Sequence, residues 1–181
     1  ILVSGEHGPT TAPKDKIMAL LHQRVLAVTE NTGRCSFSSI SNTAKGGQTS
    51  GLENLIGLGH GLTPSGDDFL AGVVMGLFKM QKNREAELLA CNLYRAAHNK
   101  TTSISLAFYR ALAECRIAES HDQFLQTFGK AEIKNRERCL TLVSSFGCTS
   151  GWDTLAGMVF GISLVMRPLI KKRNHVMETT C

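Results

Sequence analysis

The residues best suited to chemistry lie in a glycine-rich stretch, residues 57–76, that contains two adjacent acids, Asp67 and Asp68. The stretch reads GLGHGLTPSGDDFLAGVVMG, and His60 is the histidine of its loop. Glycines accept unusual backbone angles and let a ligand approach the main chain. A helix that begins near Ser65 offers amide N–H groups and the positive end of its dipole, which suits an anion.

Several interpretations of the acids stay open. Ser65-x-x-Asp68 has the form of a capping box, but capping alone explains neither the three preceding glycines nor Asp67, so we favour a site. Asp67 and Asp68 could hold Mg²⁺, although adjacent acids in a first turn more often stabilise the helix dipole, and we predict no metal. His60 could serve as a general acid or a hydrogen-bond donor.

A second stretch, residues 147–161, repeats this sequence pattern as GCTSGWDTLAGMVFG. If Pro64 is left out the two stretches align, and from Ser65 onward each position lies 85 residues before its counterpart, as Ser65 and Ser150 illustrate. We interpret the pair as an internal duplication. Cys148 precedes the expected helix start, where the pKa of a thiol tends to fall, although a buried inert cysteine is the alternative.

Both stretches place an acid and two glycines four residues apart on one helix face. These stripes are Asp68, Gly72 and Gly76 in the first copy, and Asp153, Gly157 and Gly161 in the second. Glycines have no side chain, so these stripes let two helix backbones approach closely. We therefore expect the two helices to be central and packed on each other. Their N-termini should then converge on one cleft, with Thr101 and Thr102 on its wall.

The elements that must position these residues are helices. Apolar residues recur at helical spacing, which predicts a mainly α, bundle-like domain with the pseudo-twofold duplication inside it. The expected helices cover 14–30, a short segment near 52–56, 69–81, 84–98, 101–115, 122–130, 131–144 and 150–166, the last stopped by Pro168. Thr101-Thr102-Ser103 should cap the helix over 101–115. A short strand is possible over 36–40. We divide the chain into an N-terminal remnant (1–50), a helical domain (51–170) and a basic tail (171–181).

Composition limits the classes of function. The 181 residues carry a net charge of +5 and no basic run interleaved with aromatics, which argues against nucleic-acid binding. The apolar segment 155–166 is too short to cross a bilayer. The six cysteines contain no C-x-x-C pair, which favours reduced thiols and a cytoplasmic protein. Histidines outside the loop lack ligand spacing and are expected at the surface or at helix ends. Because the chain starts at Ile1, we expect an N-terminal part to be missing.

Three blocks make the chain similar to a known family. The blocks are GHGLTPSGDDFLAG (59–72), Thr101-Thr102 with Ser105 and Arg110 beyond it, and GCTSGWDTLAG (147–157). They resemble the AllH family, a subunit of oxamate carbamoyltransferase in bacterial allantoin degradation, a branch of purine catabolism. The family pattern differs in having histidine at the positions of Cys148 and Gly66.

The resemblance implies a reaction that moves a carbamoyl group between phosphate and the amide nitrogen of oxamate, giving or consuming oxalurate. It implies a small anionic substrate (carbamoyl phosphate, phosphate, oxamate or oxalurate), FdrA-like and AllG-like partner subunits, and no cofactor. Self-association of the chain stays open. The missing histidines support an alternative, a non-catalytic anion-binding or assembly subunit of an FdrA-like complex.

The candidate residues follow from the motifs and the resemblance together. The catalytic candidates are His60, Asp67, Asp68 and Asp153. The substrate-binding candidates are Gly59, Gly61, Thr63, Ser65, Gly66, Thr101, Thr102, Ser105, Arg110, Cys148, Thr149, Ser150 and Gly151.

Overall fold

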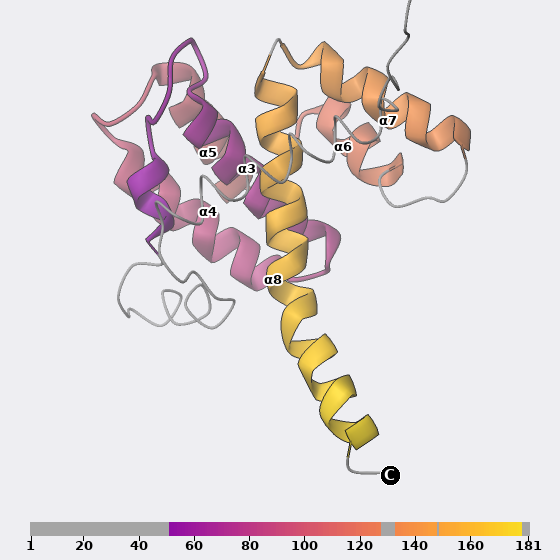
Figure 1. Ribbon diagram of the computed structural model, residues 1–181. Coiled ribbons are helices and arrows are strands. Elements are labelled where there is room, and N and C mark those ends of the chain that lie inside the picture. The colour runs from indigo at the N-terminus through magenta and orange to yellow at the C-terminus, as the bar shows by residue number, and fades with distance from the viewer. Residues whose placement is uncertain (1–50, 128–132, 148, 179–181) are drawn as a thin grey trace, which may run out of the picture.

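The computed structural model describes residues 51–127, 133–147 and 149–178, and within these ranges it is built of helices without a strand (Figure 1). The mainly α fold predicted from the sequence is therefore confirmed. The helix expected over 14–30 and the strand expected over 36–40 lie outside the described residues.

The elements follow one another with short connections. In chain order they are a 3-10 helix η1 (Leu52–Leu55), α3 (Ser65–Lys79), α4 (Asn83–Ala97), α5 (Ser103–Ala113), α6 (Glu119–Thr127), α7 (Ile133–Ser145) and α8 (Ser150–Glu178). The expected helices match these in number and place over the described residues, and their ends differ by a few residues except at the C-terminal end of α8.

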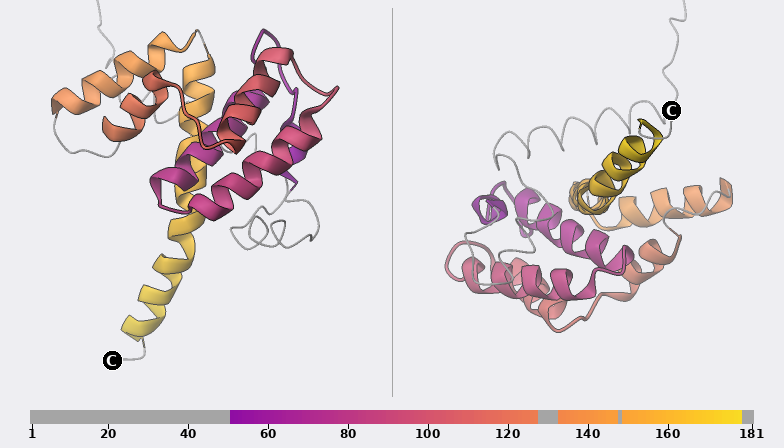
Figure 2. Two further views of the ribbon diagram at one scale, coloured as in Figure 1. Left: turned by 180° about the vertical axis from the view of Figure 1, so that it is seen from behind. Right: turned by 90° about the horizontal axis from the view of Figure 1, so that it is seen from below.

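Helix α3 is the centre of the fold. It packs along α8 on one side and against α4 and α5 on the other, while α6 and α7 pack on each other and reach α8 through α7 (Figure 2). Phe69, Leu70, Val73, Val74 and Leu77 of α3 are almost completely buried. Burial all around a helix is expected for the core of a bundle.

The predicted glycine stripes form the contact between α3 and α8. A Cβ added at Gly72 would lie 2.1 Å from the carbonyl oxygen of Thr154, and one at Gly157 would lie 1.9 Å from that of Phe69. Only glycine fits where backbones approach so closely. The helices run in the same direction, because Gly76, one turn after Gly72, meets Met158, one turn after Thr154.

These contacts are reciprocal under the 85-residue offset. Gly72 meets Thr154 and Gly157 meets Phe69, and Phe69 is the counterpart of Thr154. Likewise, Gly161 meets Val73 in the way that Gly76 meets Met158. A pseudo-twofold axis between the helices would produce this pattern, so the duplication remains our interpretation of the two stretches.

Helix α8 corrects one prediction. Pro168 does not stop the helix, which continues to Glu178 and extends beyond the bundle (Figure 1). Proline fixes φ near its helical value and removes one hydrogen bond, so it interrupts the hydrogen-bond ladder at a single point without ending the helix here. The division between a domain ending at 170 and a tail starting at 171 therefore falls inside a continuous helix.

Candidate functional site

The glycine loop folds back onto the start of α3. Gly57, Gly59 and Gly61 have φ of 74°, 115° and 103°, values that favour glycine. This path lets the Leu58 carbonyl accept a hydrogen bond of 2.8 Å from the Gly66 amide. The backbone of the loop therefore covers the N-terminal end of α3.

This closure changes the prediction for α3. Its N-cap is Pro64 and no side chain caps it, so the capping box at Ser65 is absent. The amides of Asp67 and Asp68 donate to the Pro64 carbonyl at 2.9 and 3.1 Å, in addition to the bond that Gly66 makes. Much of the donor capacity that a helix N-terminus offers an anion is thus used within the protein. A ligand at this helix start would therefore contact side chains more than backbone amides.

Asp67 is buried and surrounded by donors from three segments. Its exposed fraction is 3%, and it accepts hydrogen bonds from the Tyr109 hydroxyl at 2.7 Å and from the Gly57 amide at 3.1 Å. The Thr101 hydroxyl donates a further short hydrogen bond to its Oδ2. Three donors satisfy a buried carboxylate well, so Asp67 joins the loop, α3 and α5.

Asp68 faces α8 and is less well satisfied. The hydroxyls of Ser150 and Thr63 are its hydrogen-bond partners, and they also contact each other at 3.0 Å. A hydroxyl has one proton, so the Thr63–Ser150 bond leaves a single proton for the carboxylate. Its Oδ2 is buried and has no hydrogen-bond partner in the part of the chain that the structure describes. Burial raises the pKa of Asp68 to about 6, against the lowering effect of the two hydroxyls.

The start of α5 completes the cluster. Thr102 is its N-cap and accepts a hydrogen bond of 3.2 Å from the Ser105 amide, as the sequence predicted. The Thr102 hydroxyl also donates to the Leu62 carbonyl of the glycine loop at 2.7 Å. The starts of α3, α5 and α8 therefore converge on one place, which agrees with the predicted convergence of the two copies.

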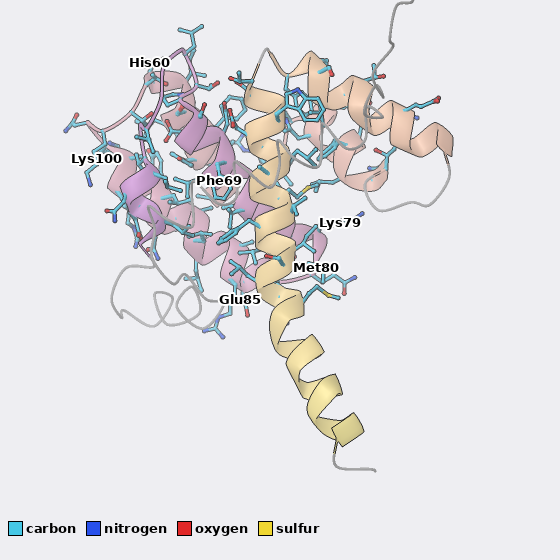
Figure 3. The ribbon with its side chains drawn as sticks, in the orientation of Figure 1. His60, Phe69, Lys79, Met80, Glu85 and Lys100 are labelled. Atoms are coloured by element: carbon cyan, nitrogen blue, oxygen red, sulfur yellow. The ribbon has the colours of Figure 1, made fainter. Side chains whose placement is uncertain are left out.

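A small cavity of about 30 Å³ lies beneath these helix starts. Its lining contains both acids, and its other residues come from α3, α5, α6 and α8: Ala71, Met75, Ser105, Phe108, Tyr109, His121 and Thr154. A larger groove of about 540 Å³ lies near Lys79, at the opposite end of α3 from His60, and shares no residue with this cavity (Figure 3). Two residues with a buried polar atom that lacks a hydrogen-bond partner among the described residues, Asp68 and His121, both line the small cavity.

Two predicted glycines serve packing. A Cβ at Gly66 would lie 2.0 Å from the Leu55 carbonyl oxygen, and one at Gly151 would lie 1.8 Å from that of Val143. The histidine that the family pattern has at position 66 would therefore not fit this backbone. Gly59 packs against Ser65, whereas Gly61 has open space around it.

Other predicted residues are not brought into the cavity. His60 is exposed at the loop tip, and Arg110 pairs with Glu114 at 3.0 Å on the exposed face of α5. Thr149 is exposed, and its carbonyl accepts the first amide bonds of α8. Asp153 is buried, with an exposed fraction of 4%. Cys148 lies outside the described residues.

The sequence did not single out Tyr109, His121 or Thr154. Tyr109 follows Ser105 by one helical turn, which was the only local signal that it shares a face with a candidate. His121 was expected at the surface or at a helix end. It does lie near the start of α6, but it is partly buried and stacks on Phe146, with ring centroids 4.2 Å apart.

Neither a metal centre nor a membrane span is found within the described ranges. No group of three or more histidine, cysteine or acidic side chains there could hold a metal ion. No helix in those ranges is both long enough and apolar enough to cross a membrane.

Comparison with known proteins identifies the family of this chain. No solved structure matches the chain. Residues 55–162 match the family described as "Oxamate carbamoyltransferase subunit AllH", and this segment runs from η1 into α8, so it includes the loop, both glycine stripes and the cavity. Since the match covers more than half of the chain, the protein belongs to the AllH family.

Proposed function

We propose that this chain provides the carbamoyl-accepting site of an oxamate carbamoyltransferase, with Asp68 as its proton-transfer residue. The family supplies the reaction class, a subunit of that enzyme. The single observation that carries the residue assignment is Asp68 itself, a carboxylate between two helix starts with a pKa of about 6 and a buried oxygen without a partner.

The reaction requires a proton at the amide nitrogen. In the direction of phosphorolysis, a phosphate oxygen attacks the carbamoyl carbon of oxalurate, and the bond from that carbon to the oxamate nitrogen breaks. The nitrogen must gain a proton as it leaves. In the reverse direction the oxamate nitrogen attacks carbamoyl phosphate and loses the same proton. One group of suitable pKa can serve both directions.

Asp68 has the properties that this role needs. A general acid or base is most effective when its pKa lies near the working pH, and burial has moved the pKa of this carboxyl to about 6. The Thr63 and Ser150 hydroxyls hold the carboxylate in place. Asp67 acts indirectly. Its hydrogen bonds from Thr101 and Tyr109 position the first turn of α3.

Phosphate or carbamoyl phosphate needs positive potential, which the converging starts of α3, α5 and α8 would supply. A helix N-terminus favours a nearby negative charge by about 0.3–1 kcal/mol when exposed and up to about 2 when partly buried. The hydroxyls of Thr63, Thr102 and Ser150 would donate to this anion by exchanging the hydrogen bonds that they now make within the protein. The FdrA-like and AllG-like subunits would contribute the rest of the site.

A second candidate function is a non-catalytic assembly subunit. It is favoured by the glycine loop, where Leu58 and Leu62 are 53% and 75% exposed next to the site. Exposed leucines on a loop fit an interface with another protein. In this case the acids would position the loop for a partner and take no part in turnover.

Turnover by the reconstituted complex separates the two functions. The complete set of subunits is given oxalurate and phosphate, and carbamoyl phosphate is measured. We expect Asp68→Asn to lower kcat by about 10²–10⁴-fold, the usual contribution of general acid–base catalysis. The matched control is Asp122→Asn, an exposed carboxylate on α6 that accepts a hydrogen bond from Gln126, and it should keep full activity.

The pH dependence gives a second check. Phosphorolysis needs protonated Asp68, so its rate should fall as pH rises through about 6, while oxalurate synthesis should rise over the same range. Both limbs should be absent in Asp68→Asn. Full turnover by Asp68→Asn would reject the catalytic assignment and favour the assembly function.

A further inference from the structure

The cavity beneath the helix starts contains two unsatisfied polar atoms that complement each other. Asp68 Oδ2 and His121 Nδ1 are both buried, and neither has a hydrogen-bond partner among the residues described. Leaving a buried polar group unsatisfied destabilises the folded chain, so two such groups around one cavity call for an explanation. A bound ligand that hydrogen-bonds to both would provide it.

The ring of His121 is held by aromatic neighbours. It stacks on Phe146 with an interplanar angle of 16°, and Phe108 meets it edge-on with centroids 6.3 Å apart. Burial lowers the pKa of His121, so the imidazole is neutral near pH 7. A neutral imidazole has one N–H donor and one acceptor nitrogen, and it can therefore donate from Nδ1.

His121 also lies between the small cavity and a wider space. A groove of about 400 Å³ shares Met75, Phe108 and His121 with the lining of the cavity. The remaining walls of this groove come from the end of α5 and the segment that follows it. A small acid could thus place one end in the cavity and the rest in the groove.

We propose that His121 is a ligand-binding residue that acts with Asp68, and that the cavity takes a primary amide group. The amide N–H would donate to Asp68 Oδ2, and the amide carbonyl would accept from His121 Nδ1. This inference deepens the proposed function and depends on it, since oxamate carries such an amide. It adds a residue that neither the motifs nor the family description assigns.

Size and chemistry favour an amide head. A water-sized group needs about 10–15 Å³ of such space, so a cavity of about 30 Å³ admits two or three small atoms. A primary amide brings one donor nitrogen and one acceptor oxygen, which matches one carboxylate oxygen and one imidazole N–H. A carboxylate head has no donor for Asp68 and would place two like charges together.

The test is oxamate binding to the full chain labelled with ¹⁵N-histidine. His121 is assigned through contacts of its ring with Phe146. We expect oxamate to move the His121 ring resonances saturably, while His98, an exposed histidine beside Tyr94, stays unchanged. Pyruvate has a methyl group in place of the amide nitrogen, and it should bind about tenfold or more weakly because Asp68 then finds no donor.

Variants sharpen the test. His121→Phe keeps an aromatic ring against Phe146 and should weaken oxamate binding about tenfold or more. His98→Phe is the matched control and should bind oxamate as the unchanged chain does. In Asp68→Asn the preference for oxamate over pyruvate should largely disappear. If His121→Phe does not fold, the resonance shifts of the unchanged chain decide the question.

Several outcomes would overturn the proposal. They are oxamate binding that leaves the His121 resonances unmoved, equal affinity in His121→Phe, and no binding of oxamate by the chain at 100-fold excess of ligand over protein. Such results leave the proposed function standing if turnover of the complete complex still requires Asp68, because oxamate would then reach Asp68 without a contact to His121. Conversely, oxamate binding at His121 with an inactive complete complex would reject the proposed function and leave the amide site.

Discussion

The two sides of the α3 N-terminus differ in how well they satisfy a carboxylate. On the α5 side, Asp67 receives hydrogen bonds from Tyr109, Thr101 and the Gly57 amide. On the α8 side, Asp68 shares the Thr63 and Ser150 hydroxyls, and its Oδ2 lacks a partner among the described residues. The surroundings of these two adjacent aspartates therefore give them different roles.

The difference has a geometric cause. Consecutive residues of an α-helix point about 100° apart, so neighbours in sequence face different helices. The α5 side presents three donors, from the glycine loop, from the connection before α5 and from α5 itself, that meet at one carboxylate. The α8 side is a glycine-mediated contact in which backbones nearly touch, and it leaves little room for polar side chains. Close packing on that side therefore leaves Asp68 half-buried, with its Oδ2 away from solvent.

The largest effect should come from breaking the α8 side at its packing. In Gly157→Ala the new Cβ would lie 1.9 Å from the Phe69 carbonyl oxygen, and only a shift of one helix against the other could relieve it. Overpacking of a core costs about 1–3 kcal/mol and occasionally more, and we expect the upper end here, about 3 kcal/mol or more. Urea unfolding followed by circular dichroism measures the loss.

A neighbouring position on α8 is the control. Val159 is exposed on the outer side of the same helix, so Val159→Ala should change the free energy of unfolding by about 0.5 kcal/mol or less. A Gly157→Ala variant as stable as Val159→Ala would mean that α3 and α8 do not meet as described. The explanation of the poor solvation of Asp68 would then fail with it.

Breaking the α5 side should have the next largest effect. In Asp67→Asn the side-chain N–H₂ would face donors and the charge-assisted hydrogen bonds would be lost, so we expect a loss of about 2–3 kcal/mol. Tyr109→Phe removes one donor and should cost less, about 1–2 kcal/mol. The double variant should lose less than the sum, because both changes remove the same bond. Strict additivity of the two losses would contradict a direct Tyr109–Asp67 interaction.

Much of this fold was predictable from local patterns. Apolar spacing located α3 through α8, and the acid and glycine stripes correctly predicted that α3 and α8 pack together with their starts adjacent. Thr102 was correctly predicted as a cap because capping depends on residues three apart. The failures at Ser65 and Pro168 have local causes as well, a backbone carbonyl that replaces the cap and a helix that tolerates one proline.

The site was only partly predictable, because its chemistry depends on contacts far apart in sequence. Asp67 and Tyr109 lie 42 residues apart, and no pattern within α5 indicates which hydroxyl reaches the acid. His121 shares no motif with Asp68, and only packing brings both to one cavity. The sequence could also not show that the glycine loop uses the α3 amides itself, since this requires its path in space.

The smallest effect should come from removing the charge of Asp68 on the α8 side. This change should raise the free energy of unfolding, whereas the changes above lower it. The pKa of Asp68 is about 6 in the folded state against an ordinary value of 3.8, so between these values the folded chain binds more protons than the unfolded chain. Stability contributed by this group is therefore greatest below about pH 4 and is lost as pH rises towards 6. The full shift corresponds to about 3 kcal/mol, which partial solvent exposure reduces to about 1–2 kcal/mol.

Asp68→Asn should consequently be more stable than the unchanged chain above pH 6, by about 1 kcal/mol, with the difference vanishing near pH 4. Urea unfolding of both proteins from pH 4 to pH 8 measures this difference, and pH effects of other groups cancel in the comparison. A variant less stable than the unchanged chain at pH 7.5 would show that Asp68 is satisfied like Asp67. A gain in stability together with a loss of turnover would instead identify Asp68 as a group kept in place for function, because such sites commonly trade stability for activity.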